Sequence, residues 1–141
     1  MKPINGRPVV PDTKLRAIPV ESETMGHYLC AILNSSPAVL LLYVTAQWVQ
    51  TPDYQATDIQ RLLIPQFDPT DRLHQELARL SFKAHALAAA EGSSELARVQ
   101  SQVDRVASKL WGITVSELDA IQDDLTEIGR SKRGASEEVE A

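Results

Sequence analysis

Three histidines are the first side chains in this sequence that invite a chemical role. His74 and His85 are eleven residues apart, which places them on nearly the same face of a helix. A helix rises about 1.5 Å per residue, so the two imidazoles would lie about 16 Å apart and could not share one ion. We therefore expect no metal site, with His74 and His85 flanking a packed seam and His27 on the surface near a helix start.

Two further patterns suggest catalysis, and neither is complete. Asp12-Thr13-Lys14 matches the closing half of a metal-dependent nuclease motif, but no carboxylate precedes Asp12 to help hold the ion. Cys30 is the only cysteine and stands among Leu29, Ala31 and Ile32, which predicts a buried and inert thiol. No glycine-rich phosphate loop is present either. We expect no catalytic residues and no cofactor.

Nucleic-acid contact has better support, because cations, amides and aromatic rings occur close together. The net charge is -5, yet residues 1–20 carry four cations and one acid. A polar loop at residues 47–55 adds amides and rings, side chains typical of contacts to base edges and phosphates. An ordinary polar surface is the alternative. The predicted DNA-contact residues are Asn5, Arg7, Lys14, Arg16, Gln47, Gln50, Tyr54 and Gln55.

A helical hairpin is the strongest structural signal in the chain. Apolar residues at alternating steps of four and three follow Ile64-Pro65, and the rhythm resumes after Gly92-Ser93-Ser94. The two stripes must face each other and leave a seam for a further helix or a partner. The residues expected to dock a partner are Leu73, Leu77, Leu80, Leu87, Leu96, Val99, Val103, Val106 and Leu110.

Shorter elements surround the hairpin. The prolines and β-branched residues of 6–20 predict two edge strands, and residues 63–65 a brief strand ended by Pro65. Residues 27–33 predict a short helix closed by Asn34 in a left-handed turn. Residues 38–49 predict a buried helix, although a buried strand fits the same apolar run. Residues 58–62 predict a short turn after Thr57, and the long helix should begin near Thr70.

The C-terminal part begins with a capping box, Thr114-Val115-Ser116-Glu117, which predicts a short third helix to Ile128 that folds back on the hairpin. From Gly129 the sequence is small and charged, so we expect a disordered tail. The fold expected is α+β and predominantly helical. Its parts are a strand-and-helix subdomain at 1–68, a helical spacer and docking arm at 69–128, and the tail at 129–141.

The segment before the hairpin bears on localisation. Met1-Lys2-Pro3 leads into polar residues rather than an apolar stretch, so no signal peptide is expected. The apolar run at 38–49 falls short of the roughly 20 residues that a membrane span needs. We expect a cytoplasmic protein without membrane contact.

The order of several short motifs resembles one protein family. These motifs are Gly6–Asp12, the His27–Ser35 segment HYLCAILNS, the Leu63–Asp68 segment LIPQFD, the Leu73–Ser81 segment and the stretch Leu110–Leu118. In this order they resemble the C-terminal target-recognition region of bacterial N6-adenine DNA methyltransferases and combined restriction-methylation enzymes, over residues 4–128. The resemblance implies a domain that reads a DNA sequence, with helices as spacer and docking surface.

Two departures from that family limit the activity expected. The sequence has neither the glycine-containing loop for S-adenosylmethionine nor the Asn/Asp-Pro-Pro-aromatic tetrad that holds a flipped adenine. The resemblance therefore implies a non-catalytic recognition portion, a fragment or a small subunit. Its partners would be a methyltransferase or restriction-modification subunit and DNA, which the acidic chain would bind weakly alone. The alternative is a helical protein-interaction module with no DNA role.

Overall fold

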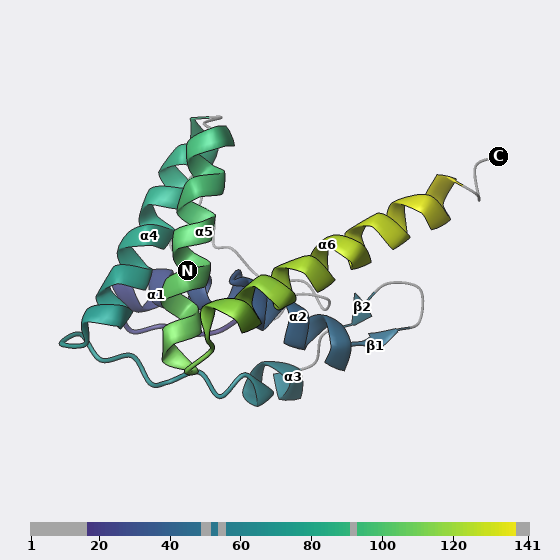
Figure 1. Ribbon diagram of the computed structural model, residues 1–141. Coiled ribbons are helices and arrows are strands. Elements are labelled where there is room, and N and C mark those ends of the chain that lie inside the picture. The colour runs from purple at the N-terminus through teal and green to yellow at the C-terminus, as the bar shows by residue number, and fades with distance from the viewer. Residues whose placement is uncertain (1–16, 49–51, 54–55, 91–92, 138–141) are drawn as a thin grey trace, which may run out of the picture.

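The computed structural model describes residues 17–48, 52–53, 56–90 and 93–137, the last seven by their backbone alone, and this part is 76% helix. Figure 1 shows a two-helix hairpin standing on a base of shorter helices, with the last helix extending to one side. The elements in chain order are α1 (Glu23–Leu33), α2 (Ser36–Thr45), β1 (Gln47–Trp48), β2 (Pro52–Asp53), α3 (Ala56–Arg61), α4 (Arg72–Ala89), α5 (Ser93–Leu110) and α6 (Val115–Glu137).

The first two helices are set by short polar residues. Ser22 is the N-cap of α1, and its hydroxyl accepts a hydrogen bond from the Met25 N–H at 3.1 Å. Asn34 ends α1, as predicted, but with φ of -97° it is not left-handed. Its side chain instead donates to the Cys30 carbonyl oxygen at 2.8 Å. Pro37 lies in the first turn of α2, where its missing N–H costs no hydrogen bond.

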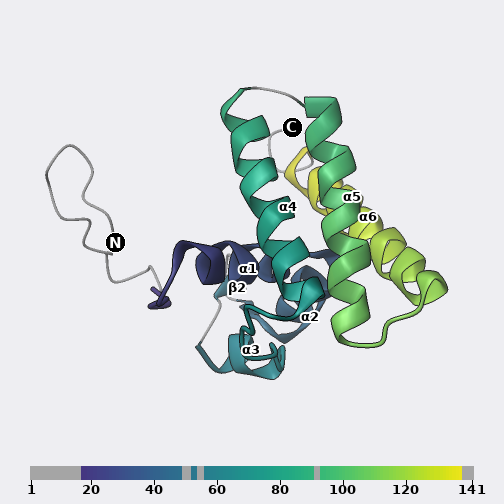
Figure 2. The ribbon, with the colours of Figure 1, turned by 90° about the vertical axis from the view of Figure 1, so that its left-hand side faces the viewer.

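The predicted helical hairpin is confirmed. Asp71 caps α4 by accepting hydrogen bonds from the N–H groups of Leu73 and His74. The seam between α4 and α5 is filled by α1, as the two views show (Figure 2). The core that results contains Tyr28, Ala31, Ile32, Leu77, Ala78, Leu80, Val99, Val103 and Ala107. It draws on both sides of the predicted domain boundary between residues 68 and 69.

The capping box at the start of α6 is also confirmed. The Thr114 N–H donates to the Glu117 carboxylate at 2.7 Å, and the Glu117 N–H donates back to the Thr114 hydroxyl at 3.3 Å. The third helix is not short, because α6 continues to Glu137 across much of the predicted tail. It packs chiefly on α2 and less on α5, and its later turns extend away from the hairpin.

The predicted α+β class and its strand-and-helix subdomain are wrong. The strands in the described residues are the two-residue pair β1 and β2, which are antiparallel with Gln47 opposite Asp53. Residues 17–20 form no strand, and the rest of the predicted edge strands lies outside the described residues. Residues 63–65 form none either, because Leu63 has a φ of 48°, which extended backbone excludes.

The helix predicted at 38–49 is a helix rather than a strand, but it ends earlier than expected. Ala46 has a ψ of 145°, so the backbone leaves the helix there and enters β1. Among the described residues, no single helix is both long enough and apolar enough to cross a bilayer. Only α1 and α2 taken together have that length and apolar content, and the two helices are bent by 65° relative to each other.

Candidate functional site

Of the motifs that carry the family resemblance, three contact one another, and the Gly6–Asp12 motif lies outside the described residues. The Tyr28 hydroxyl donates to the Pro65 carbonyl oxygen at 2.8 Å, and the Asp68 N–H donates to His74 Nδ1 at 3.0 Å. His27 Nδ1 lies 3.1 Å from the Ser81 hydroxyl. We call these three contacts, together with the bond from Trp111 to Leu62, the motif network.

The fourth contact of the motif network comes from the last motif. Trp111 Nε1 donates to the Leu62 carbonyl oxygen at 3.1 Å. This bond ties the end of α5 to the segment between α3 and α4, which has no regular secondary structure. Three motifs are therefore linked directly, and the fourth is linked to the residue that precedes the Leu63–Asp68 motif.

Tyr28 is the centre of the motif network. Its side chain is fully buried, and its ring lies 5.3 Å from that of Phe67 and 4.6 Å from that of His74, centre to centre. Burial, together with the nearby Asp71 carboxylate, raises the pKa of Tyr28 to about 12. The phenol is thus kept neutral, as its hydrogen bond to Pro65 requires.

This raised pKa predicts a loss of stability in alkali. A phenol whose pKa is higher in the folded state contributes its full stability below the unfolded pKa of 10, and loses it as the pH rises to about 12. We expect the free energy of unfolding to fall across this window in urea titrations followed by circular dichroism. Tyr28→Phe should show a shallower fall, and an identical fall in both proteins would contradict this assignment.

A buried carboxylate links three helices beside the motif network. Asp104 of α5 is 3% exposed. Its two oxygens accept from the Ser36 N–H and the Ser36 hydroxyl, both at 2.8 Å, and Oδ2 also accepts from Gln122 of α6 at 2.9 Å. Ser36 begins α2, so a negative charge from α5 meets the positive end of the α2 dipole. We call these contacts the Asp104 brace.

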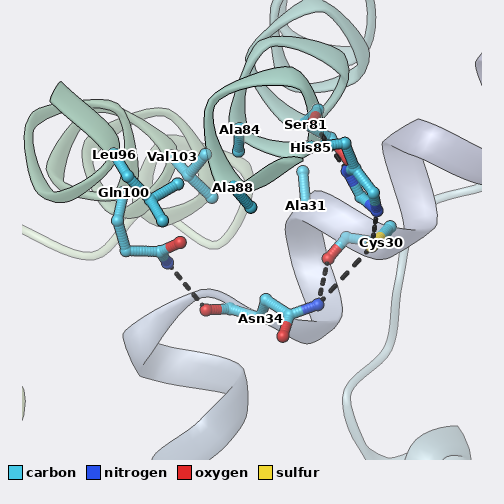
Figure 3. Close-up of a pocket in the computed structure, with 10 residues that line it drawn as sticks. All are labelled: Cys30, Ala31, Asn34, Ser81, Ala84, His85, Ala88, Leu96, Gln100 and Val103. Carbon is cyan, nitrogen blue, oxygen red and sulfur yellow. Dashed lines mark hydrogen bonds between the residues drawn. The ribbon is translucent and has the colours of Figure 1, made fainter. Parts of the chain in front are cut away.

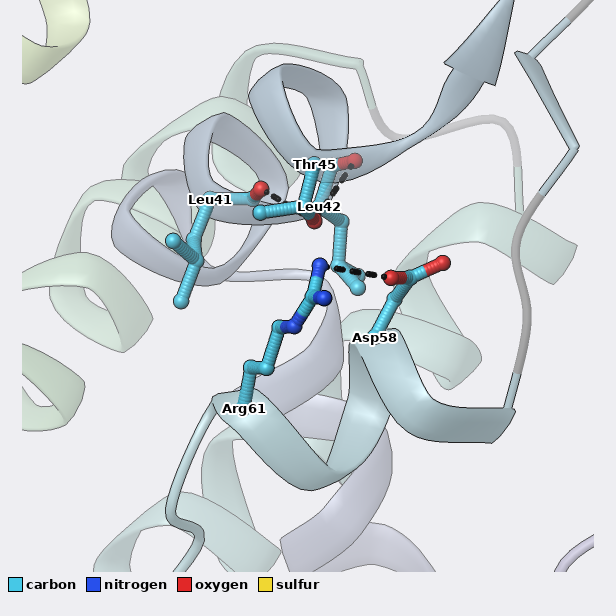
Figure 4. Close-up of polar contacts among 5 residues, drawn as sticks. All are labelled: Leu41, Leu42, Thr45, Asp58 and Arg61. Atoms are coloured by element: carbon cyan, nitrogen blue, oxygen red, sulfur yellow. Dashed lines mark hydrogen bonds and ion pairs between the residues drawn. The ribbon is translucent and has the colours of Figure 1, made fainter.

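The predicted DNA-contact loop lies between two helices that pack together. It leaves α2 through β1 and returns through β2 to α3. Thr45 at the end of α2 donates to the Leu41 carbonyl oxygen at 2.8 Å, and Arg61 pairs with the buried Asp58 carboxylate at 3.2 Å (Figure 4). Each contact lies within its own helix, close to one end of the loop.

The structure leaves the predicted DNA contacts themselves open. The backbone of Gln47 is described as part of β1, without its side chain. The other predicted contacts lie outside the described residues, namely Asn5, Arg7, Lys14, Arg16, Gln50, Tyr54 and Gln55.

Several of the predicted docking residues are used inside the chain. Leu77, Leu80, Val99 and Val103 are at most 2% exposed and form the core with α1. The remaining ones are half-buried, and those that pack against this core are Leu87, Val106 and Leu110, whereas Leu73 and Leu96 lie at other half-buried positions. Most residues of the two apolar stripes are thus used for packing within the chain.

The histidines differ in part from expectation. His74 is buried and His85 is exposed, as flanks of the packed seam. His27 is not a free surface residue, because its ring makes edge contacts with Phe82 at 5.3 Å and with His85 at 5.1 Å. In the described ranges, no three His, Cys, Asp or Glu side chains come together to hold a metal ion.

Two important residues were missed by the sequence reasoning. Asp104 stands next to the apolar stripe of α5 and looks like an ordinary polar flank. Trp111 was identified only through the resemblance, although a tryptophan just beyond a helix end often buries its ring and uses its N–H. Comparison of this chain with protein-family models, with curated proteins and with solved structures finds no match to any of them.

Proposed function

We propose that this chain is the DNA sequence-recognition portion of a restriction-modification DNA methyltransferase and has no catalytic residues of its own. The observation that carries the proposal is the motif network. Of the five motifs that carry the resemblance, three contact one another directly through residues such as Tyr28, Pro65 and His74. Trp111 of a fourth motif bonds to Leu62, next to the Leu63–Asp68 motif.

The arrangement of the helices also suits a recognition module. The Asp104 brace holds α2 against α5 and α6, and α2 leads directly into the loop that the sequence predicts to contact DNA. A recognition loop needs a rigid support, because base readout requires hydrogen-bonding groups to be held in register. In this proposal the helices are that support.

A selection experiment tests the proposal directly. The chain is incubated at low ionic strength with a pool of DNA duplexes that have a randomised centre, and the bound duplexes are sequenced. We expect enrichment of one short sequence. No enrichment, with association to a methyltransferase subunit that does not change with salt, would favour the protein-interaction module instead.

A salt titration examines the predicted cations. Each phosphate contact contributes about -0.9 to the slope of log affinity against log salt. Arg7→Gln, Lys14→Gln and Arg16→Gln together should therefore make the slope shallower by about 2 to 3. The matched control removes three exposed cations of α5 by Arg98→Gln, Arg105→Gln and Lys109→Gln. Equal slopes in the two triple variants would remove the basic segment from the interface.

A further inference from the structure

A cavity next to the motif network lies between α1, α4 and α5. Its volume is about 240 Å³. Most of its wall is apolar, with Ala84, Ala88, Leu96 and Val103 from the hairpin. Because a cavity of about 150 Å³ already holds benzene in a protein interior, this one has room for an aromatic ring. Figure 3 shows that Cys30, Asn34 and His85 gather on one side of it.

The His85 ring is oriented as a base toward the Cys30 thiol. Its Nδ1 lies 2.8 Å from the Ser81 carbonyl oxygen, which can only accept, so Nδ1 carries the hydrogen. In the neutral ring Nε2 then has a free electron pair, and this atom lies 4.0 Å from the Cys30 Sγ. A nucleophile, a base and a third group that orients the base are the arrangement that activates thiols and hydroxyls in enzymes.

A hydrogen-bond donor also faces the sulfur. Asn34 Nδ2 lies 3.6 Å from Sγ, and the same nitrogen donates to the Cys30 carbonyl oxygen at 2.8 Å. That carbonyl fixes which end of the amide points this way, since only the nitrogen can donate to it. The side chain of Gln100 in α5 donates to the main-chain carbonyl oxygen of Asn34 at 2.8 Å and holds Asn34 in place. Negative charge that forms on the sulfur thus meets an N–H donor.

From this geometry we propose that Cys30 is a nucleophilic thiol that exchanges with small aromatic disulfides bound in the cavity, with His85 as its base. The thiol proton moves to His85 Nε2, and the sulfur attacks one sulfur of the disulfide. A new bond forms between Cys30 Sγ and the sulfur that it attacks, as the bond between the two sulfurs of the bound disulfide breaks. The released half leaves as a thiolate and takes a proton from His85, so Cys30 is oxidised and the released half is reduced.

This assignment differs from the inert thiol expected from the sequence. The apolar neighbours Leu29, Ala31 and Ile32 predicted burial, but Cys30 is only half-buried. The neighbours of Cys30 in the sequence point to other faces of α1. The side chains that face the sulfur are those of Asn34 and of His85 in α4. The adduct would place its ring beside Leu96 and Val103, where α5 packs against α4.

The single cysteine makes the test direct, because the whole signal reports Cys30. The probe is 4,4′-dithiodipyridine at neutral pH, followed by the absorbance of the released thiopyridone. The reference is the same chain unfolded in urea. General-base assistance typically contributes about 100-fold or more, so we expect the folded chain to react at least about tenfold faster than the unfolded one. A folded rate equal to or below the unfolded rate would overturn the proposal.

Variants separate the base from the cavity. His85→Gln should lose most of the advantage over the unfolded chain, and Arg79→Gln, an exposed change on the same helix, should retain it. Leu96→Trp fills the cavity and should slow the aromatic probe more than it slows a small alkyl disulfide. A His85→Gln rate equal to that of the unchanged protein would remove His85 from its role. If His85→Gln does not fold by circular dichroism, the comparison of folded and unfolded chain decides alone.

Discussion

Replacing Asp104 with alanine is expected to lower the free energy of unfolding by about 3 kcal/mol, because it removes a buried charged acceptor. Four hydrogen bonds are lost at once, two from Ser36, one from Gln122 and a longer one from Gln100 at 3.5 Å. The Ser36 N–H then has no partner at the start of α2. Chemical denaturation followed by circular dichroism measures the change.

The location of the damage separates the Asp104 brace from a general loss of packing. Hydrogen exchange should increase first in α6, because α6 packs chiefly on α2 and is bonded to Asp104 through Gln122. Asp104→Asn keeps one acceptor oxygen and should cost about half as much. Asp123→Ala is the matched control on an exposed acid of α6 and should stay within about 0.5 kcal/mol. A loss for Asp104→Ala no larger than this control would show that the brace contributes nothing.

A second large effect is expected for Leu77→Ala, which should destabilise the protein by about 3 kcal/mol and lower Tm by about 10 °C. Leu77 is fully buried among residues of α1 and α5, so truncation leaves a cavity in the shared core. Leu87→Ala serves as the comparison, because Leu87 belongs to the same stripe but is only half-buried. Calorimetry that gave equal losses for both variants would contradict the packing of α1 in the seam.

Local signals in the sequence were enough to find the helices. Ser22, Asp71 and the Thr114–Glu117 box are caps whose hydrogen bonds join residues at most three positions apart. Asp71 and the Thr114–Glu117 box begin their helices close to where expected, whereas α1 begins at Glu23, four residues before the predicted start. The heptad steps likewise revealed two facing helices. They could not reveal what fills the seam, because α1 is contributed by a distant segment.

The errors arose where distant residues decide the local backbone. Residues 63–65 read as a strand from their apolar side chains, but the neighbouring Leu62 carbonyl oxygen is held by Trp111, 49 residues away, and Leu63 is left-handed. The start of α2 is capped by Asp104, 68 residues away, whereas the N-cap residue Ser35 makes no side-chain capping bond. Composition predicted a disordered tail from Gly129, whereas the backbone of α6 continues to Glu137.

The placement of α1 in the seam has a consequence for synthesis on the ribosome. Tyr28 and Ile32 emerge first, but the leucines and valines that cover them belong to α4 and α5. Because the ribosome adds roughly 5 to 20 residues per second, the side chains of Tyr28 and Ile32 remain uncovered for several seconds. During that interval the apolar face of α1 is exposed to solvent and to chaperones. The hairpin of α4 and α5 forms later from contacts that are near in sequence, and α1 then packs onto it.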